Sequence, residues 1–362
     1  MAAPDLFLRI MAAAYDELRE RRGGSDQPRF LMSFFGKTPQ ERTVSETDRV
    51  DVDVRRSNRT VAADVIRGGG QGNSNMPERF SAKEYKVPLY WEESPITAYQ
   101  LYKRGLGQNP YDVSSGNRAK LVRLVNDVQF KQTDKIELEM ERMASEGLLS
   151  GTITLRNTES LDFGKKSGHS VTPSTKWDNS GDPLTDIESM CQTIHQDGNV
   201  KPNIAVFGQS AWDVFINNAT VQAELDKRFI QPGRINPAEV MDGAVYQGRM
   251  WFGSYQLDLY TYPQWYENAA GSNVDYITTD SVVIFNTMAR YDKVFGAVEL
   301  LPQYEAMYRD MGLPMLPGFV PGQMVPFAYE KPPTAFMAGV QSAPLLIPVA
   351  IDTIGTLDNV DT

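Results

Sequence analysis

The alternation of apolar and charged residues near the N-terminus predicts an extended β-hairpin. Three valines recur at every second position between charged residues, the period of a strand with one apolar face: Val50, Val52 and Val54. Similar strand-like stretches cover residues 60–67 and 84–91, and residues 68–77 between them are rich in glycine and asparagine, as in a hairpin tip. We predict one long hairpin over residues 47–95. Because an isolated two-stranded ribbon is only marginally stable in water, we expect it to lie on another surface.

The clearest predicted helix covers residues 114–148. Its apolar residues recur mostly at steps of three and four: Leu121, Val125, Val128, Ile136, Met140 and Met143. Ser114 and Ser115 are capping candidates at its start, and Gly147 is its expected end. At about 1.5 Å per residue, such a helix is roughly 50 Å long. This length is natural for a structural spine and unusual for a compact enzyme domain.

Acidic residues also follow this predicted helix: Glu137, Glu139, Glu141 and Glu146. We interpret them as a solvated face and not as a metal cluster, because glutamates are mostly exposed. Directly after the helix, residues 151–164 alternate as a hairpin of two short strands.

From residue 182 the pattern changes to mixed helix and strand. We expect a helix from Asp182-Pro183 to Gly198, a buried strand over 203–208, helices over 210–217 and 221–229, and strands over 247–262 and 274–286. Beyond residue 312 the chain is rich in proline, yet it ends in the apolar stretch 340–351. Such a stretch must be tied back into a core, so we infer that the chain leaves one domain, builds a second and returns.

Residues 1–46 are interpreted as an arm. It carries two apolar patches, Leu6 to Met11 and Phe30 to Phe35, separated by charged sequence. Two explanations stay open at this point: a terminus that packs on its own core, and an arm that binds a neighbouring subunit.

Composition permits a sizeable core, because 41% of the 362 residues are hydrophobic. Lys and Arg number 36 against 46 Asp and Glu, which gives a net charge of −10. This is the wrong sign for tight binding of nucleic acid through its phosphates, whereas an acidic or neutral lining suits a container for a polyanion. No apolar run is long enough to cross a membrane and no secretory signal is recognised, so we expect a protein of the cytosol.

The sequence shows no catalytic or metal-binding pattern. The single Cys191 has the helical spacing of a core residue, and the only histidines, His169 and His195, have no metal-ligand spacing. The glycines of residues 68–72 lack the following Lys-Ser/Thr and helix of a phosphate-binding loop. We therefore expect no catalytic residue, no cofactor and no metal.

An ordered set of short segments extends over nearly the whole chain: DLFLR at 5–9, DVIRGGG at 64–70, DFGK at 162–165, Trp177, DP at 182–183, DIE at 186–188, NIAVFG at 203–208, AWDVF at 211–215, ELDKR at 224–228, YQG at 246–248 and VQSAPL at 340–345. This set resembles the phage lambda major capsid protein (protein E) family. No single segment is specific for this family. The common order and approximate spacing of the segments are specific. Residues 16–48 match least.

The resemblance implies an α+β fold of the Hong Kong 97 type. It divides the chain into an N-terminal arm (1–46), an extended hairpin loop (47–95), a peripheral domain (96–181) with the spine helix 114–148, an axial domain (182–312) and a C-terminal return to the peripheral domain (313–362). It also implies contacts with other subunits from the extended loop, at Arg67, Gly68, Gly69, Gly70, Gln71, Gly72, Asn73 and Asn75, and from the arm, at Leu6, Phe7, Leu8 and Arg9.

The function implied by the resemblance is that of a tailed-phage major capsid protein. Copies of the chain would assemble as hexamers and pentamers into an icosahedral head around double-stranded DNA, in the cytoplasm of the host bacterium. The implied partners are a small trimeric decoration protein and, during assembly, a scaffold and a portal; no membrane is involved. Two alternatives stay open: another virion protein such as a tail-tube subunit, and a cytosolic hydrolase with its site in residues 182–312.

Overall fold

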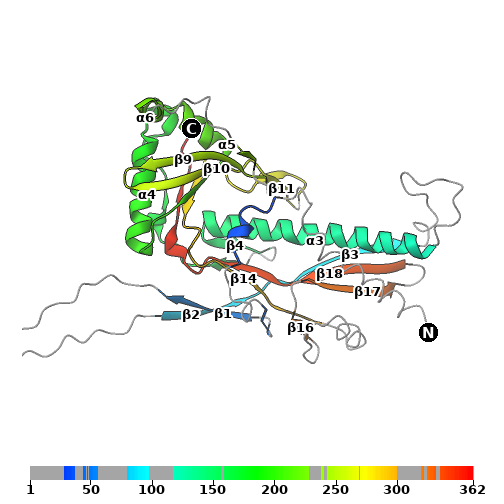
Figure 1. Cartoon of the computed structure of the whole chain (residues 1–362). Helices are drawn as coiled ribbons and strands as arrows, with labels where there is room; N and C mark the ends of the chain where they lie inside the picture. Colours follow the sequence, from blue (N-terminus) through cyan, green and yellow to red (C-terminus); the bar gives the residue numbers. More distant parts are fainter. Residues whose placement is uncertain are drawn as a thin grey trace, which may run out of the picture.

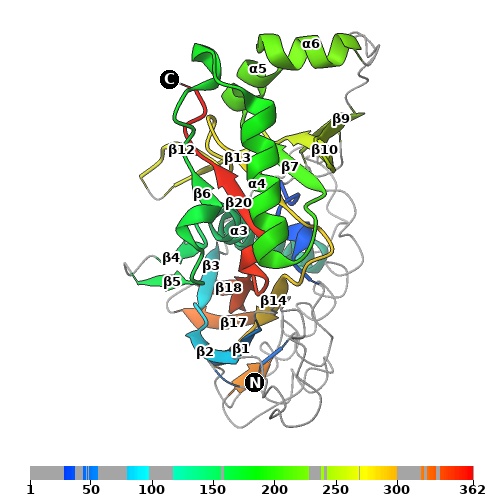
Figure 2. The same ribbon diagram turned by 90° about the vertical axis from the view of Figure 1, so that its left-hand side faces the viewer.

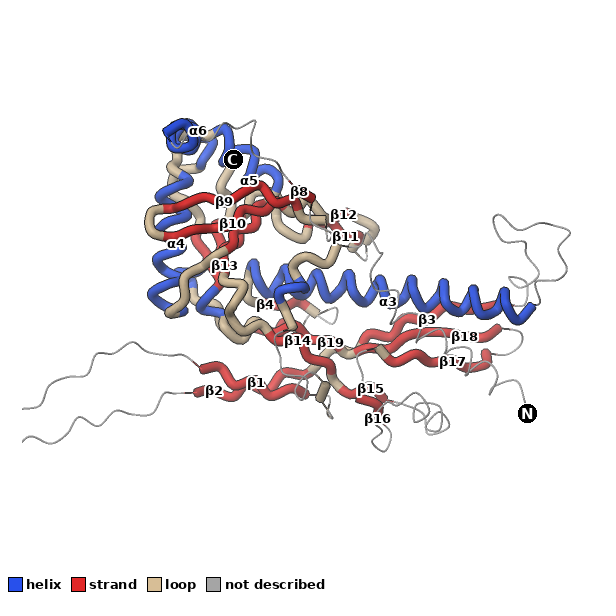
Figure 3. The backbone as a smooth tube through the Cα atoms, in the orientation of Figure 1, coloured by secondary structure: helices blue, strands red, loops and turns tan. Residues whose placement is uncertain are grey.

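A long helix forms the axis of the molecule in the computed structural model. The structure describes residues 28–36, 44–45, 47, 49–55, 80–97, 117–155, 159–227, 238–239, 243–268, 270–299, 319–321, 324–331 and 335–361. In Figure 1 the long helix α3 (Asn117–Leu149) runs horizontally, with a helix-covered sheet above it and a second sheet below it. Figure 3, in the same orientation, shows strands on both sides of this helix.

The predicted spine helix is confirmed over residues 117–149. The side chains of Val125, Ile136 and Met140 are buried, whereas Val128 is half-buried. The expected end at Gly147 is wrong by two residues, because the helix continues to Leu149. Gly151, with φ of 71°, makes the turn instead. Gly147 faces the ring of Pro348, where a Cβ would lie at an ordinary contact distance of 3.8 Å. The cap candidates Ser114 and Ser115 lie outside the described residues.

A three-stranded antiparallel sheet lies along α3 (Figure 1). Its strands, in spatial order, are β17 (Val325–Lys331), β18 (Ala335–Ser342) and β3 (Tyr90–Thr97). Gln132 of the helix donates a hydrogen bond to the carbonyl of Ala338 at 3.1 Å, so helix and sheet share polar as well as apolar contacts. The C-terminal segment is therefore tied back to the spine, as its apolar sequence requires.

The second large element is a seven-stranded mixed sheet. Its spatial order is β6 (Ser170–Val171), β20 (Ile354–Leu357), β13 (Val282–Phe285), β7 (Ile204–Phe207), β10 (Tyr255–Thr261), β9 (Val245–Phe252) and β8 (Ala238–Glu239). The four residues of β7 are all buried, because Ile204 and Val206 face the core around the spine while Ala205 and Phe207 face a second core. Such continuous apolar runs are typical of strands covered on both faces.

Three helices cover the second face of this sheet, as Figure 2 shows from the side: α4 (Pro183–Gly198), α5 (Gln209–Asn217) and α6 (Ala219–Lys227). The predicted start of α4 is confirmed, because the Asp182 side chain accepts from the Leu184 N–H and Pro183 is the first helical residue. Asn199, in the left-handed conformation with φ of 56°, ends it. The helices predicted over 210–217 and 221–229 correspond to α5 and α6.

The hairpin base predicted from the valine alternation is confirmed. β1 (Arg49–Arg55) pairs antiparallel with β2 (Phe80–Lys86), with Val50 opposite Tyr85, and both strands lead away from the body in Figure 1. The predicted single strand over 84–91 is wrong. β2 ends at Lys86, and β3 starts at Tyr90 in the sheet beside α3. Pro88 lies in the gap, where its missing N–H interrupts a ladder. The predicted strand over 60–67 lies outside the described residues.

Short paired strands and turns complete the fold. The strand pairs are β4 (Thr152–Thr154) with β5 (Ser160–Asp162), β11 (Trp265–Glu267) with β12 (Asn273–Asp275), β14 (Asp292–Phe295) with β19 (Pro344–Ile347), and β15 (Ala297–Glu299) with β16 (Phe319–Pro321). The 3₁₀ turns are η1 (Met32–Phe34), η3 (Ser167–His169), η4 (Trp177–Asn179) and η7 (Ile351–Thr353). The hairpin predicted over 151–164 is β4–β5.

The end of the chain joins both large sheets. β18 and β19 lie beside the spine, whereas β20 pairs with β13 inside the seven-stranded sheet. The expected return of residues 313–362 to the part of the fold around the spine describes β18 and β19. The buried strand β20 continues into the seven-stranded sheet.

Candidate subunit-contact site

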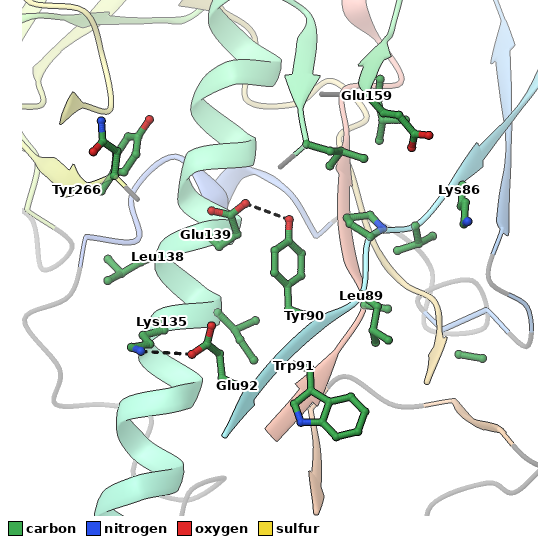
Figure 4. Close-up of a pocket in the computed structure, with 18 of the residues that line it drawn as sticks. Lys86, Leu89, Tyr90, Trp91, Glu92, Lys135, Leu138, Glu139, Glu159 and Tyr266 are labelled. Atoms are coloured by element: carbon green, nitrogen blue, oxygen red, sulfur yellow. Dashed lines mark hydrogen bonds and ion pairs between the residues drawn. The ribbon is translucent and has the colours of Figure 1, made fainter. Parts of the chain in front are cut away.

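A groove of about 1050 Å³ opens beside the spine helix (Figure 4). Its walls come from the hairpin base and β3, the middle of α3, the β4–β5 hairpin, and β11 with the residue that follows it, together with Ala297 and Ala343. Apolar side chains at its edge are exposed to an unusual degree, since Leu89 is 49% and Trp91 is 53% accessible. Large aromatic residues exposed beside charged ones are typical of surfaces that bind other proteins.

Polar pairs across the groove fix its shape. The Tyr90 hydroxyl donates to Glu139 Oε1 at 2.9 Å, and Lys135 Nζ lies 3.2 Å from Glu92 Oε2 (Figure 4). Burial, and then the Glu139 carboxylate, raise the pKa of Tyr90 above its ordinary value, so this phenol stays a donor. Both pairs tie β3 to the spine helix, and the groove wall is therefore set by the fold.

The acidic residues of the spine helix are not the solvated face that their sequence predicts. Glu137 and Glu141 are buried, and Glu141 is 0% exposed. Glu139 and Glu146 form ion pairs with Arg142, which lies between them in sequence. Sequence periodicity missed this because the partners of Glu141 come from segments over a hundred positions away, residues 31, 32 and 262.

The second apolar patch of the predicted arm is found on the chain's own core. Phe30, Leu31 and Phe35 are buried against the core of the spine. For residues 28–36, the explanation of a terminus packed on its own core is confirmed. The first patch, which contains the predicted contact residues Leu6, Phe7, Leu8 and Arg9, lies outside the described residues.

The contact residues predicted at the hairpin tip also lie outside the described residues: Arg67, Gly68, Gly69, Gly70, Gln71, Gly72, Asn73 and Asn75. The structure places the two ends of that loop, Arg55 and Phe80, opposite each other. The groove was not predicted from sequence. Leu89 and Trp91, two large apolar residues close to Pro88, were the only indication of it in the sequence. Their exposure depends on the tertiary fold.

Cys191 and His169, two side chains with reactive groups, are both buried in the fold. Cys191 is buried, and burial raises its pKa to about 12, which leaves an inert thiol. His169 Nδ1 lies 2.8 Å from the Ile354 carbonyl and its Nε2 lies 3.0 Å from Asp197, so this buried ring joins η3, α4 and β20. Among the described residues there is no cluster of three ligands that suits a metal ion.

Lys165 caps the C-terminal end of the spine helix. Its Nζ donates to the carbonyls of Leu148 and Leu149, at 3.3 and 2.6 Å, and to Thr356 Oγ1 at 3.2 Å. The two carbonyls belong to the last turn of α3, where they lack intrahelical partners. Burial lowers the pKa of Lys165 to about 8. The contact joins the spine to β20 of the seven-stranded sheet.

The family model for phage major capsid protein E matches residues 24–358. The chain therefore belongs to the phage major capsid protein E family. It is accordingly a major capsid protein of a tailed bacteriophage, a structural component of the virion. No curated protein matches its sequence.

The first of three solved structures shares this fold, and the other two align less closely. A prophage protein from Escherichia coli CFT073, described as a capsid protein, aligns with a TM-score of 0.60 at 14% identity, over 93% of this chain and 95% of that chain. The SrpI encapsulin of Synechococcus elongatus PCC 7942 aligns at 0.47 and 14%, over 93% and 89%. The capsid of the myovirus XM1 aligns at 0.43 and 12%, over 94% and 97%. The expected α+β fold of the Hong Kong 97 type is confirmed.

Across the described residues, no helix is both long and apolar enough to cross a membrane. The long helix α3 instead carries charged residues along its length, and it packs against a sheet.

Proposed function

We propose that the chain assembles as hexamers and pentamers into an icosahedral head that encloses double-stranded DNA, and that it has no enzymatic activity. One observation carries this proposal. Beyond its base, where Val50 and Tyr85 pack on the core, the hairpin β1–β2 projects from the body, and among the described strands each of its strands pairs only with the other. Because a ribbon of two strands is marginal alone, a neighbouring copy is the natural support. The net charge of −10 suits a lining that does not grip the DNA tightly.

We propose that the regions act as the family resemblance implies. Residues 96–181 with the returning C-terminal strands form the peripheral part, and residues 182–312 form the axial part around the capsomer centre, to which β20 adds a strand. Arm residues 1–27 and the loop between β1 and β2 contact adjacent subunits. Assembly takes place in the host cytoplasm with a scaffold and a portal.

A deletion of residues 68–75 tests the role of the loop. The variant should remain a folded, soluble subunit that fails to form closed heads, because the deleted residues contact another copy. A control that replaces the same eight positions with an equal number of Gly and Ser residues separates the length of the loop from its side chains. Electron microscopy of the purified proteins decides the outcome; normal closed heads from the deletion variant contradict the proposal, and tubes favour the alternative of a tail-tube subunit.

The groove is proposed as part of the same contact. It begins at the hairpin base, where Lys86 and Val87 line its wall, and a neighbour that supports one hairpin reaches Leu89 and Trp91 next. Replacing both Leu89 and Trp91 with serine should leave the melting temperature nearly unchanged and reduce shell yield. Met288→Ser, at a residue 80% exposed elsewhere, is the matched control. Equal shell yields from the two variants contradict this placement.

A small trimeric decoration protein is the proposed partner that strengthens the finished head. The predicted tip, residues 68–77, contains no lysine, so the tip cannot supply the lysine of a covalent Lys–Asn link. Purified heads, boiled and run on a denaturing gel, should show one capsid band and an abundant small protein. A ladder of capsid multimers contradicts the first half, and a lone capsid band contradicts the second.

A further inference from the structure

Three carboxylates on one face of the spine helix hold residues 28–36. Asp134, Glu137 and Glu141 follow at steps of three and four, which places them on the same side of α3. Arg29 forms ion pairs with the first two, with Nη2 lying 3.4 Å from Asp134 Oδ1. The face that sequence predicts to be solvated is therefore the contact surface for another segment of the chain.

Glu141 accepts hydrogen bonds from the backbone in this contact. Its two oxygens each accept one backbone N–H at 2.8 Å, from Leu31 and Met32. These residues begin the 3₁₀ turn η1, where the first N–H groups have no partner within the turn. A carboxylate is a favourable acceptor at such a position, although it comes from a residue 110 positions away in place of a local cap.

Glu141 also reaches the seven-stranded sheet. The hydroxyl of Tyr262, the residue after β10, donates to Glu141 Oε1 at 2.7 Å. Burial, followed by the Glu141 carboxylate, raises the pKa of Tyr262, which keeps this hydroxyl protonated. One buried side chain thus joins the spine helix, the sheet and residues 31–32.

The segment held in this way fills the space between the helix and the sheet. The Phe30 ring lies 5.1 Å from that of Tyr260 and 5.6 Å from that of Tyr262, and the Phe34 ring lies 5.1 Å from that of Phe285. All three partners belong to β10, β13 or the residue after β10. Residues 28–36 are therefore a wedge with aromatic contacts on the sheet side and carboxylate contacts on the helix side.

We propose that Glu141 is a positioning residue that sets the angle between the spine helix and the seven-stranded sheet by seating this wedge, and that it thereby sets the curvature of the shell. The second half rests on the proposed function, whereas the first half concerns the subunit alone. The hydrogen bonds of a buried carboxylate are directional, and the wedge has little freedom to shift because its rings fill the gap. A wedge that is poorly seated lets the two parts of the subunit vary in angle, and a repeated subunit of variable angle gives shells of variable size.

Glu141→Gln tests the seating. The glutamine amide nitrogen is a donor that faces a backbone N–H, so one of the two hydrogen bonds is lost. Hydrogen exchange of the peptide that covers residues 28–36 should become about tenfold faster or more, because the lost hydrogen bond to a charged group protects a backbone amide of this segment. Tyr262→Phe should give a smaller acceleration, and Glu141→Asp should restore part of the protection. Glu146→Gln is the matched control on the same helix, because Glu146 contacts Arg142 and the Thr154 N–H and not the wedge.

Particle diameters measured by electron microscopy test the curvature. Glu141→Gln should broaden the distribution of shell diameters, and Glu146→Gln should leave it narrow. Unchanged exchange in Glu141→Gln, or equal acceleration in Glu146→Gln, overturns the seating. Faster exchange with an unchanged diameter distribution overturns the proposal that Glu141 sets the curvature of the shell. If Glu141→Gln is insoluble, Tyr262→Phe decides by the same two measurements. A wild-type protein that forms no shells refutes the proposed function, while the exchange experiment still decides the seating.

Discussion

The spine helix and the extended hairpin are both regular elements, yet their surroundings differ. Between Ile136 and Leu148, most side chains of α3 are buried against two sheets and the wedge. The hairpin has a regular ladder, but Arg49 and Glu84 of its polar face are more than half exposed. The helix therefore contributes mainly to the folding of the subunit, whereas the proposed role of the hairpin is association with other copies.

The largest effect is expected in the spine. Val125→Asp places an unpaired carboxylate where the native side chain is 0% exposed, at a cost of several kcal/mol out of a total stability of about 5–15 kcal/mol. The variant should be insoluble. Val128→Asp, at a half-buried position on the same helix, should be milder. Comparing soluble yields and melting temperatures checks the pair, and equal behaviour would show that the buried side of the helix is misassigned.

A smaller loss is expected at Gly208, between β7 and α5. A Cβ there would lie 2.2 Å from the Thr278 carbonyl oxygen and 2.5 Å from that of Thr279, and backbone atoms cannot move aside cheaply. Gly208→Ala should lower the free energy of unfolding by about 2–3 kcal/mol in denaturant titration. Gly168→Ala, which meets nothing within 4 Å, is the control. A loss at Gly168 as large as that at Gly208 would refute the packing argument.

The buried Lys165 predicts a pH dependence of about 1 kcal/mol. Its pKa is lowered from 10.5 to about 8, so between these values the unfolded chain binds more protons than the folded one. Stability then rises with pH through this window. Between pH 7 and 9, the free energy of unfolding of the wild type should gain about 1 kcal/mol relative to Lys165→Met. Parallel pH profiles for the two proteins would contradict the lowered pKa.

The smallest effect on the subunit is expected in the hairpin. Arg49 and Glu84 form an ion pair at 3.1 Å with side chains 57% and 51% exposed, and such surface pairs contribute about 0–1 kcal/mol. Replacing both with alanine should leave the melting temperature of the isolated subunit almost unchanged. A drop comparable to that of Gly208→Ala would mean that the hairpin supports the subunit fold, and the contrast between hairpin and spine would fail.

Local patterns determined the elements of this protein that carry their own signal. The three- and four-residue period over 121–143 is enough to predict the spine, and Asp182-Pro183 marks the start of α4 because capping is a contact between near neighbours. The apolar run of β7 likewise indicates a strand buried on both faces.

The tertiary structure alone decided which polar residues are buried and where strands change partner. Nothing near Glu141 in sequence distinguishes it from Glu139, yet Glu141 is enclosed by residues 31, 32 and 262, whereas Glu139 is half-buried and pairs with Arg142. β3 leaves the hairpin because its partner, β18, comes from near the C-terminus. Contacts between distant segments depend on chain packing as a whole, and the period of a single segment holds no information about its partner.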